Sequence, residues 1–272
     1  MIEAWLAGLA GLLIGSFLNV CIYRLPRDMS VVSPRSFCPQ CDRGIPWYDN
    51  IPVLSYLLLR GRCRMCGARI PVRYLLVELL TGGAFFSAVW ALGPSAAALK
   101  YCVFGAMVIT LIFSDLEERI LPDEFTLGGI VAGVAFAAVV PLNWGIMRLI
   151  LLSVQNQRLI SVAESAFAAA FCAGTLWLVG TLYQKIRHRE GLGLGDVKMV
   201  AMIGAFLGLQ GALMTLIVGS LLGAAVGLCY IWFTGKDAST YELPFGTFLG
   251  AAALGVAFFG EVFLSWYNRL GT

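Results

Sequence analysis

The sequence predicts an all-α polytopic membrane protein with about eight transmembrane helices and one small polar domain between the first two helices. Three observations predict this class. Of the 272 residues, 59% are hydrophobic and 13% are charged, whereas soluble domains carry about 25% charged residues. Apolar runs near the roughly 20 residues that a spanning helix needs recur along the chain. A single long polar segment, 23–73, interrupts them.

Eight apolar runs are the predicted helices: residues 4–22, 74–92, 96–114, 122–141, 160–184, 196–209, 211–233 and 245–268. The first run is expected to be retained, because it carries Glu3 and no Lys or Arg before Arg24, whereas a cleavable signal peptide opens with positive charge. Segment 142–159 is ambiguous and allows a surface helix at the membrane interface. The expected domains are a first helix (1–22), a polar domain (23–73) and a multi-helix membrane domain (74–272).

The basic residues are unevenly distributed over the predicted loops. Nine arginines lie in 23–73, and five further Lys or Arg residues, Lys236 among them, lie in the other loops on that face. The opposite face has four. Short loops rich in Lys and Arg stay in the cytoplasm, so we expect the polar domain to be cytoplasmic and both termini to face outward, as an even number of helices requires.

Two C-x2-C pairs, separated by 21 residues, stand in the polar domain. Their members are Cys38, Cys41, Cys63 and Cys66. This spacing is typical of a structural zinc site, in which four thiolates close a tetrahedral shell and leave no open position. Two disulfides or free thiols are the alternatives, and a cytoplasmic location argues against disulfides. Cys21, Cys102, Cys172 and Cys229 stand singly in apolar runs and are expected to be buried small hydrophobes.

Two aspartates mark the second candidate site. Asp115 ends one apolar run and Asp196 begins another, so the predicted topology places both near the cytoplasmic face. Ionisable residues of membrane helices usually face an interior cavity and often carry function. Two carboxylates in one pocket share a proton: the charged one can activate water while the protonated one polarises a carbonyl. Gly191, Gly193 and Gly195 allow a sharply turned backbone before Asp196.

Other charged residues have simpler interpretations. Asp123 is expected to be a helix cap or loop charge, Asp115 alone could pair with Arg119, and Glu78 could pair with Arg73 or Lys198. The only histidine, His188, lies in a basic loop, and the sequence has no H-E-x-x-H motif, which excludes an intramembrane zinc protease of that kind. It has no P-loop and no long basic–aromatic tract, so no nucleic-acid partner is expected.

The sequence resembles the type IV prepilin peptidases, also called leader peptidase/N-methyltransferases. The resemblance rests on the cysteine quartet and on five segments: "GSFLNVCIYRLP" (15–26), "RYLLVELLTG" (73–82), "SDLEERILPD" (114–123), "GLGLGDVKMVAMIGAFLG" (191–208) and "LPFGTFLG" (243–250). It implies that Asp115 and Asp196 are catalytic. It also implies cleavage of the basic leader of a prepilin or pseudopilin after a glycine, at the cytoplasmic side of the bacterial inner membrane. N-methylation of the new N-terminus with S-adenosylmethionine would follow, and the cysteine domain would hold zinc.

Two features depart from the family pattern. Segment 142–159 matches no family motif, and Thr247 stands where proline is frequent; neither is expected to touch the aspartates. No Gly-rich nucleoside motif is visible. The competing hypotheses are a membrane scaffold or transporter with a zinc docking domain, and a G-x-G-D protease of the presenilin kind. A transporter would be expected to show internal repeats, and the sequence shows no convincing one. A presenilin-like protease would carry its aspartates deeper within apolar helices.

Overall fold

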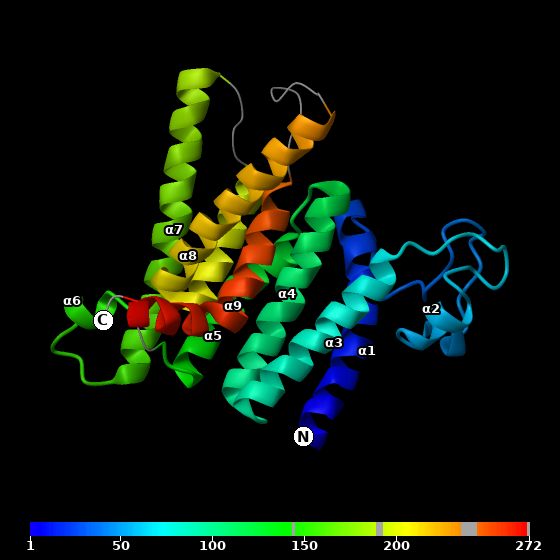
Figure 1. The fold of residues 1–272 in the computed structure, drawn as a ribbon, viewed down its shortest axis with the longest axis horizontal. Helices are drawn as coiled ribbons and strands as arrows, with labels where there is room; N and C mark the ends of the chain where they lie inside the picture. Colours follow the sequence, from blue (N-terminus) through cyan, green and yellow to red (C-terminus); the bar gives the residue numbers. More distant parts are fainter. Residues whose placement is uncertain (143–144, 189–192, 235–243, 271–272) are drawn as a thin grey trace. The chain divides into compact units, whose positions relative to one another are not determined.

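The computed structural model describes residues 1–142, 145–188, 193–234 and 244–270 (Figure 1). Gly191 and Lys236, which the sequence analysis uses, lie outside these residues, as does Leu243 of the "LPFGTFLG" motif. The chain forms two compact units, Met1–Ser114 and Asp115–Thr272. Each is described by itself.

The elements follow in chain order. They are α1 (Ile2–Arg24), η1 (Leu25–Arg27), η2 (Trp47–Asn50), α2 (Leu54–Leu58), α3 (Arg73–Leu92), α4 (Ala96–Glu118), α5 (Asp123–Val139), α6 (Met147–Ile150), α7 (Gln157–Arg187), α8 (Leu194–Thr234) and α9 (Phe245–Leu270). The boundary between the two units falls inside α4, so Asp115 belongs to the second unit.

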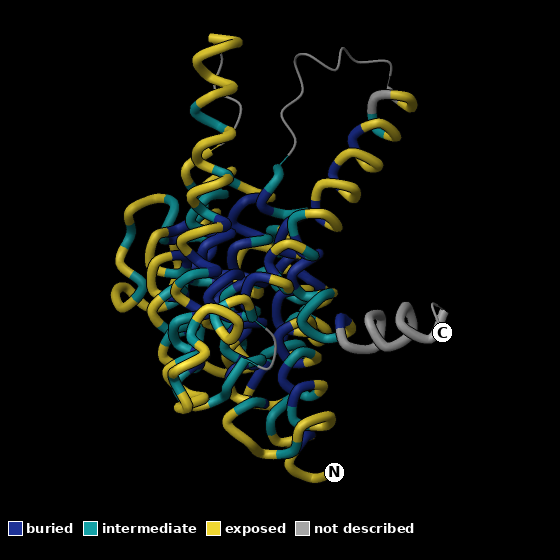
Figure 2. The backbone as a smooth tube through the Cα atoms, turned by 90° about the vertical axis from the view of Figure 1, so that its left-hand side faces the viewer, coloured by how far each residue is buried: buried dark blue, intermediate teal, exposed yellow. Residues whose placement is uncertain are grey.

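Within the described ranges, five helices are long and apolar enough to cross a membrane, namely α1, α3, α4, α7 and α8; the apolar part of α9, Phe245–Gly260, is shorter. The predicted all-α membrane class is therefore confirmed, but the count of eight spans is not. Exposed residues extend along the helices as well as the loops (Figure 2). Large apolar side chains are among them, including Leu13, Leu178 and Leu221, as expected of surfaces that face lipid.

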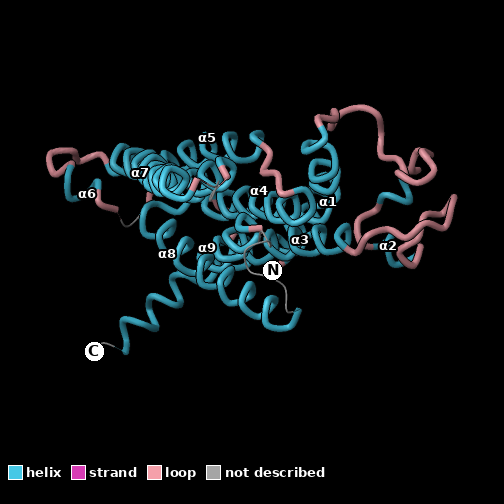
Figure 3. Tube along the Cα trace, turned by 90° about the horizontal axis from the view of Figure 1, so that it is seen from above, coloured by secondary structure: helices cyan, strands magenta, loops and turns pink. Residues whose placement is uncertain are grey.

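In the first unit, α1 packs against α3 (Figure 1). The Nδ2 of Asn19 on α1 donates to the carbonyl oxygen of Tyr74 on α3 at 3.0 Å. Nearer the other end of the pair, the rings of Trp5 and Phe86 lie 4.9 Å apart. The segment with the four cysteines is mostly loop, around the short helix α2 (Figure 3). In the described residues we find isolated β-bridges but no strand.

The second unit packs α5, α7 and α8 through small side chains. Ala169, Ala201 and Ala205 form a buried cluster. Two α7 hydroxyls reinforce it: Ser165 Oγ donates to Ala205 O at 2.7 Å, and Ser161 Oγ donates to Ala137 O at 2.8 Å. Small residues bring helix backbones close together, and such interhelical hydrogen bonds are typical of packing in membranes.

The predicted helices 196–209 and 211–233 form one element, α8, with a break at Gly208. Gly208 has φ 71° and ψ −178°, a conformation that only glycine adopts easily. The break removes intrahelical partners from the backbone N–H groups that follow it. The buried Glu164 on α7 accepts one of them, from Leu209 at 3.4 Å.

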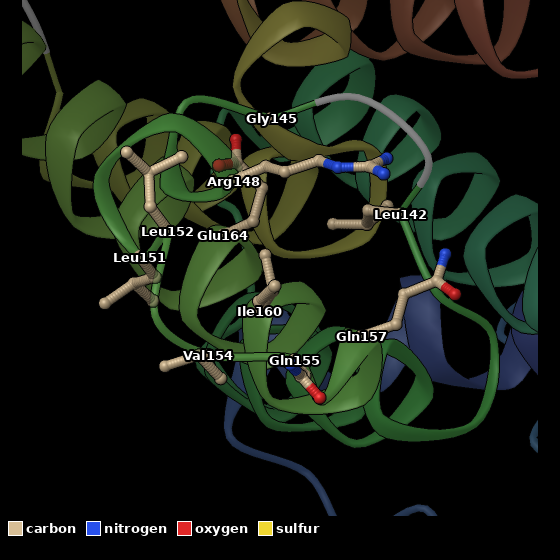
Figure 4. Close-up of a pocket in the computed structure, with 10 residues that line it drawn as sticks. All are labelled: Leu142, Gly145, Arg148, Leu151, Leu152, Val154, Gln155, Gln157, Ile160 and Glu164. Atoms are coloured by element: carbon tan, nitrogen blue, oxygen red, sulfur yellow. The ribbon is translucent and has the colours of Figure 1, made fainter.

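In the described part of segment 142–159, α6 is a single helical turn and α7 begins at Gln157, so these residues do not form a longer surface helix. Together with the start of α7, the segment lines a cavity of about 400 Å³ (Figure 4). Glu164 reaches this cavity as well and accepts a hydrogen bond from the backbone N–H of Met147 at 3.0 Å. Its carboxylate therefore stabilises α6 and the α8 break at once. Sequence analysis missed this residue.

Candidate active site and metal centre

Asp115 lies in the last turn of α4 and is 6% exposed. Its Oδ2 accepts two hydrogen bonds from Thr247, one from the backbone N–H at 2.6 Å and one from Oγ1 at 2.8 Å. Thr247 stands in the first turn of α9, where backbone N–H groups have no intrahelical partner. A carboxylate is a suitable acceptor there, because the helix dipole favours negative charge at this end.

Asp196 lies in the first turn of α8, as predicted, and is half-buried. Its distance from Asp115 can be bounded through Gly246, which lies close to both carboxylates. A Cβ atom added to Gly246 would lie 3.1 Å from Asp115 Oδ2 and 3.3 Å from Asp196 Oδ1. The two oxygens are thus no farther apart than the sum of these distances. The second unit brings both predicted aspartates to one place, beside Gly246.

Sequence analysis missed the part that the start of α9 plays in this site. The expectation that Thr247 does not touch the aspartates is wrong, because Thr247 is a direct hydrogen-bond donor to Asp115. The signal was present in the "LPFGTFLG" segment, where proline precedes a glycine and a hydroxyl residue at a helix start. Nothing in the spacing, however, indicates that this helix start lies beside Asp196 and Asp115, which are 51 and 132 positions away from Thr247 in the sequence.

Lys198 and Asp123 form an ion pair, with Nζ 2.7 Å and 3.0 Å from the two carboxylate oxygens. The pair connects the first turns of α8 and α5. Asp123 is therefore not the predicted cap: α5 has Pro122 at its N-cap and no side-chain cap. Glu78, for which a partner in Arg73 or Lys198 was predicted, accepts the backbone N–H of Val53 at 2.8 Å.

The four predicted cysteines meet in the first unit. Their Sγ atoms all lie within 4.8 Å of one another, and Cys38 Sγ is 3.9 Å from Cys66 Sγ. Each pair sits on a tight turn. The N–H of Cys38 donates to Arg43 O at 3.0 Å, and the N–H of Cys63 donates to Ala68 O at 2.8 Å. None of the four is in a disulfide.

This donor set fits a metal ion. Tetrahedral ligation at about 2.3 Å would place the sulfurs about 3.8 Å apart, close to the spacing seen. Backbone N–H groups of Cys66 and Met65 lower the pKa of Cys63 to about 7. At Cys66 the backbone N–H of Ala68 lowers the pKa, but desolvation and the neighbouring thiols outweigh it and raise the pKa to about 11. Without a cation, Cys63 and Cys66 therefore do not ionise together.

An ion pair supports the second cysteine turn. Arg64 Nε and Nη2 each donate to Asp49 at 2.7 Å. This bidentate contact lowers the pKa of the Asp49 carboxyl, mainly through the hydrogen bond from Arg64. It connects η2 to the turn between Cys63 and Cys66.

The described chain is helical and apolar enough for a membrane, and it combines two neighbouring aspartates with a four-cysteine cluster. These features define a class of membrane-embedded proteins with a paired-carboxylate site. The comparisons narrow this class. Residues 9–92 match the bacterial peptidase A24 N-terminal domain, and residues 102–228 match the type IV leader peptidase family. The chain belongs to the type IV leader peptidase family.

Three relatives illustrate the similarity, and each carries the name prepilin leader peptidase/N-methyltransferase. The protein of Myxococcus xanthus is 42% identical, over 85% of this chain and 64% of its own length. Those of Burkholderia pseudomallei strain 1026b and Xanthomonas campestris are 34% and 33% identical, over 93% and 97% of this chain and 84% and 93% of their own lengths. No solved structure matches. The resemblance seen in the sequence is confirmed, and a scaffold or transporter is not favoured.

Proposed function

We propose that this chain is a membrane-embedded aspartic endopeptidase. It cleaves the basic leader from type IV prepilins or pseudopilins after a glycine, at the cytoplasmic face of the bacterial inner membrane, and then N-methylates the new N-terminal residue. The family and the names of the relatives support the reaction. The observation that carries the proposal is that the carboxylates of Asp115 and Asp196 both lie beside Gly246.

The two aspartates divide the acid and base roles. Two carboxylates this close do not readily ionise together. The two Thr247 hydrogen bonds favour the ionised form of Asp115, so we assign the shared proton to Asp196.

Hydrolysis follows from this division of roles. Asp115 takes a proton from a water molecule while the oxygen of that water attacks the scissile carbonyl carbon. Asp196 gives its proton to the carbonyl oxygen. When the C–N bond breaks, Asp115 protonates the leaving amine and Asp196 recovers its proton from the diol.

Acidic residues near the site suit a basic leader. Glu117 and Glu118 end α4, and Glu124 lies in the first turn of α5. A negative patch raises the local concentration of a cationic segment. The arginine-rich loops support a cytoplasmic location for this face. The scissile glycine of the substrate allows the local unwinding that two opposed carboxylates require.

Zinc is the metal that we assign to Cys38, Cys41, Cys63 and Cys66. Four thiolates complete its shell, so its role is structural: it fixes both cysteine turns in a loop segment too small for a core of its own. S-adenosylmethionine would supply the methyl group. The described residues contain no strand–helix nucleotide unit, so they do not identify its site, and we assign no step to it.

Co-expression with a prepilin tests the proposal. Asp115→Asn and Asp196→Asn should each abolish cleavage, read as the mass of the substrate's N-terminal peptide, while the protein accumulates normally. The same spectrum reports any added methyl group. Asp123→Asn is the matched control and should process normally, since it removes a nearby carboxylate that pairs with Lys198. Normal processing by both single aspartate variants would overturn the dyad.

A further inference from the structure

A second cavity, of about 360 Å³, lies in the first unit between α1 and the loops on either side of the first cysteine pair. One wall is apolar and comes from α1, where Leu13, Phe17 and Val20 line it. The other end is polar and carries Arg24 and Arg35. The cavity thus has a hydrocarbon-like end and a cationic end.

Arg24 is a buried charge with neutral partners. It is 3% exposed. Its guanidinium donates to the carbonyl oxygens of Ser30 at 2.8 Å and Arg35 at 3.3 Å and lies 5.6 Å from the centre of the Phe37 ring. Among the residues that the structure describes, no carboxylate pairs with it. A buried charge without a counterion is strongly destabilising, which favours an anionic ligand in this cavity.

The apolar wall indicates what kind of anion. It belongs to α1, a candidate membrane span, and Leu13 and Phe17 are 63% and 52% exposed. From Leu13 to Arg24 the helix rises about 16 Å, close to half of the roughly 30 Å hydrocarbon core. Trp47, which also lines the cavity, is 71% exposed, as is common for aromatic residues at a membrane interface.

We infer that this cavity binds an anionic membrane phospholipid, with its phosphate at Arg24 and Arg35 and one acyl chain along Leu13, Phe17 and Val20. Each part of the cavity then has a matching part of the ligand. A small soluble anion would leave the apolar wall uncovered. The basic leader of a prepilin would be repelled by two arginines.

Native mass spectrometry of the full chain in a neutral detergent tests this inference. The probes are phosphatidylglycerol and phosphatidylcholine with the same acyl chains. The wild type should retain one phosphatidylglycerol at least tenfold more strongly than phosphatidylcholine. Arg24→Gln and Arg35→Glu should each reduce that preference at least fivefold.

Arg27→Gln is the matched control. It removes the same charge one turn away, from a side chain that donates to Tyr23 O and does not line the cavity, and it should bind like the wild type. If Arg24→Gln misfolds, Arg35→Glu, an exposed position, decides alone. Equal retention of the two lipids, an equal loss in the Arg27 control, or displacement of the lipid by inorganic phosphate or S-adenosylmethionine would each overturn the assignment.

Discussion

Thr247 donates two hydrogen bonds to a single oxygen of Asp115, although the two residues are 132 positions apart in the sequence. The first turn of α9 thus acts on the last turn of α4. The backbone bond needs only the helix start, whereas the hydroxyl bond needs this side chain. The second bond can therefore be removed by itself.

Thr247→Val should lower kcat for prepilin cleavage about tenfold while KM stays within about twofold. The change keeps the side-chain shape and the backbone donor but removes the hydroxyl. One hydrogen bond to a charged group contributes about 1.5 kcal/mol or more, and 1.36 kcal/mol corresponds to a factor of ten in rate. Thr247→Ser should restore most of the activity. Equal kcat values for the valine and serine variants would refute a role for the hydroxyl.

Gly246→Ala should reduce peptidase activity at least tenfold without preventing folding. The new methyl group would lie 3.1 Å from Asp115 Oδ2 and 3.3 Å from Asp196 Oδ1, so one of the two carboxylates must move by a few tenths of an ångström. Catalysis is sensitive to displacements of this order. Gly255→Ala is the control on the same helix, because nothing lies within 4 Å of its added Cβ. The prediction fails if the two alanine variants are equally active.

Asp123→Asn and Lys198→Met should each lower the free energy of unfolding by less than about 1 kcal/mol, because the pair is largely exposed and such pairs contribute little. Both variants should still cleave prepilin. A double-mutant cycle by thermal unfolding in detergent measures the coupling, which should be about 0.5 kcal/mol. Loss of cleavage in Lys198→Met would show that Lys198 acts on Asp196 rather than only on Asp123.

The sequence predicted this site because its chemistry is local in character. Asp115 and Asp196 stand at the ends of apolar runs, where a charged residue is costly and often functional. The cysteine pairs have the spacing that two metal-binding turns require. Thr247 and Glu164 could not be predicted in the same way. Thr247 donates its own backbone N–H and hydroxyl to Asp115 on α4, and Glu164 accepts a backbone N–H group of α8. Both contacts depend on which helix starts face which side chains. Hydropathy separated the two halves of α8 correctly, and Gly208 supplies the physical break.

The purified chain should contain about one zinc ion per molecule, measured by elemental analysis. Cys66→Ser should lower the zinc content at least tenfold and expose segment 23–73 to proteolysis, because the proposed metal would hold both cysteine turns together. Cys229→Ser should retain the metal, since Cys229, which was wrongly expected to be buried, is an exposed thiol outside the cluster. Full zinc content in the Cys66 variant would contradict the assigned ligand set.

Glu164→Ala should lower the free energy of unfolding by about 2 kcal/mol or more, because it leaves the backbone N–H groups of Met147 and Leu209 without their acceptor. Glu164→Gln should be affected less, since its amide oxygen can still accept one of the two bonds. Gln155→Ala removes a side chain from the same cavity wall and should unfold at the wild-type temperature. An unfolding temperature that falls in the order wild type, Glu164→Gln, Glu164→Ala would show that the hydrogen bonds, rather than simple filling of the cavity, stabilise the protein here. If the Gln and Ala variants are equally unstable, the charge of Glu164 rather than its two bonds holds the α8 break in place.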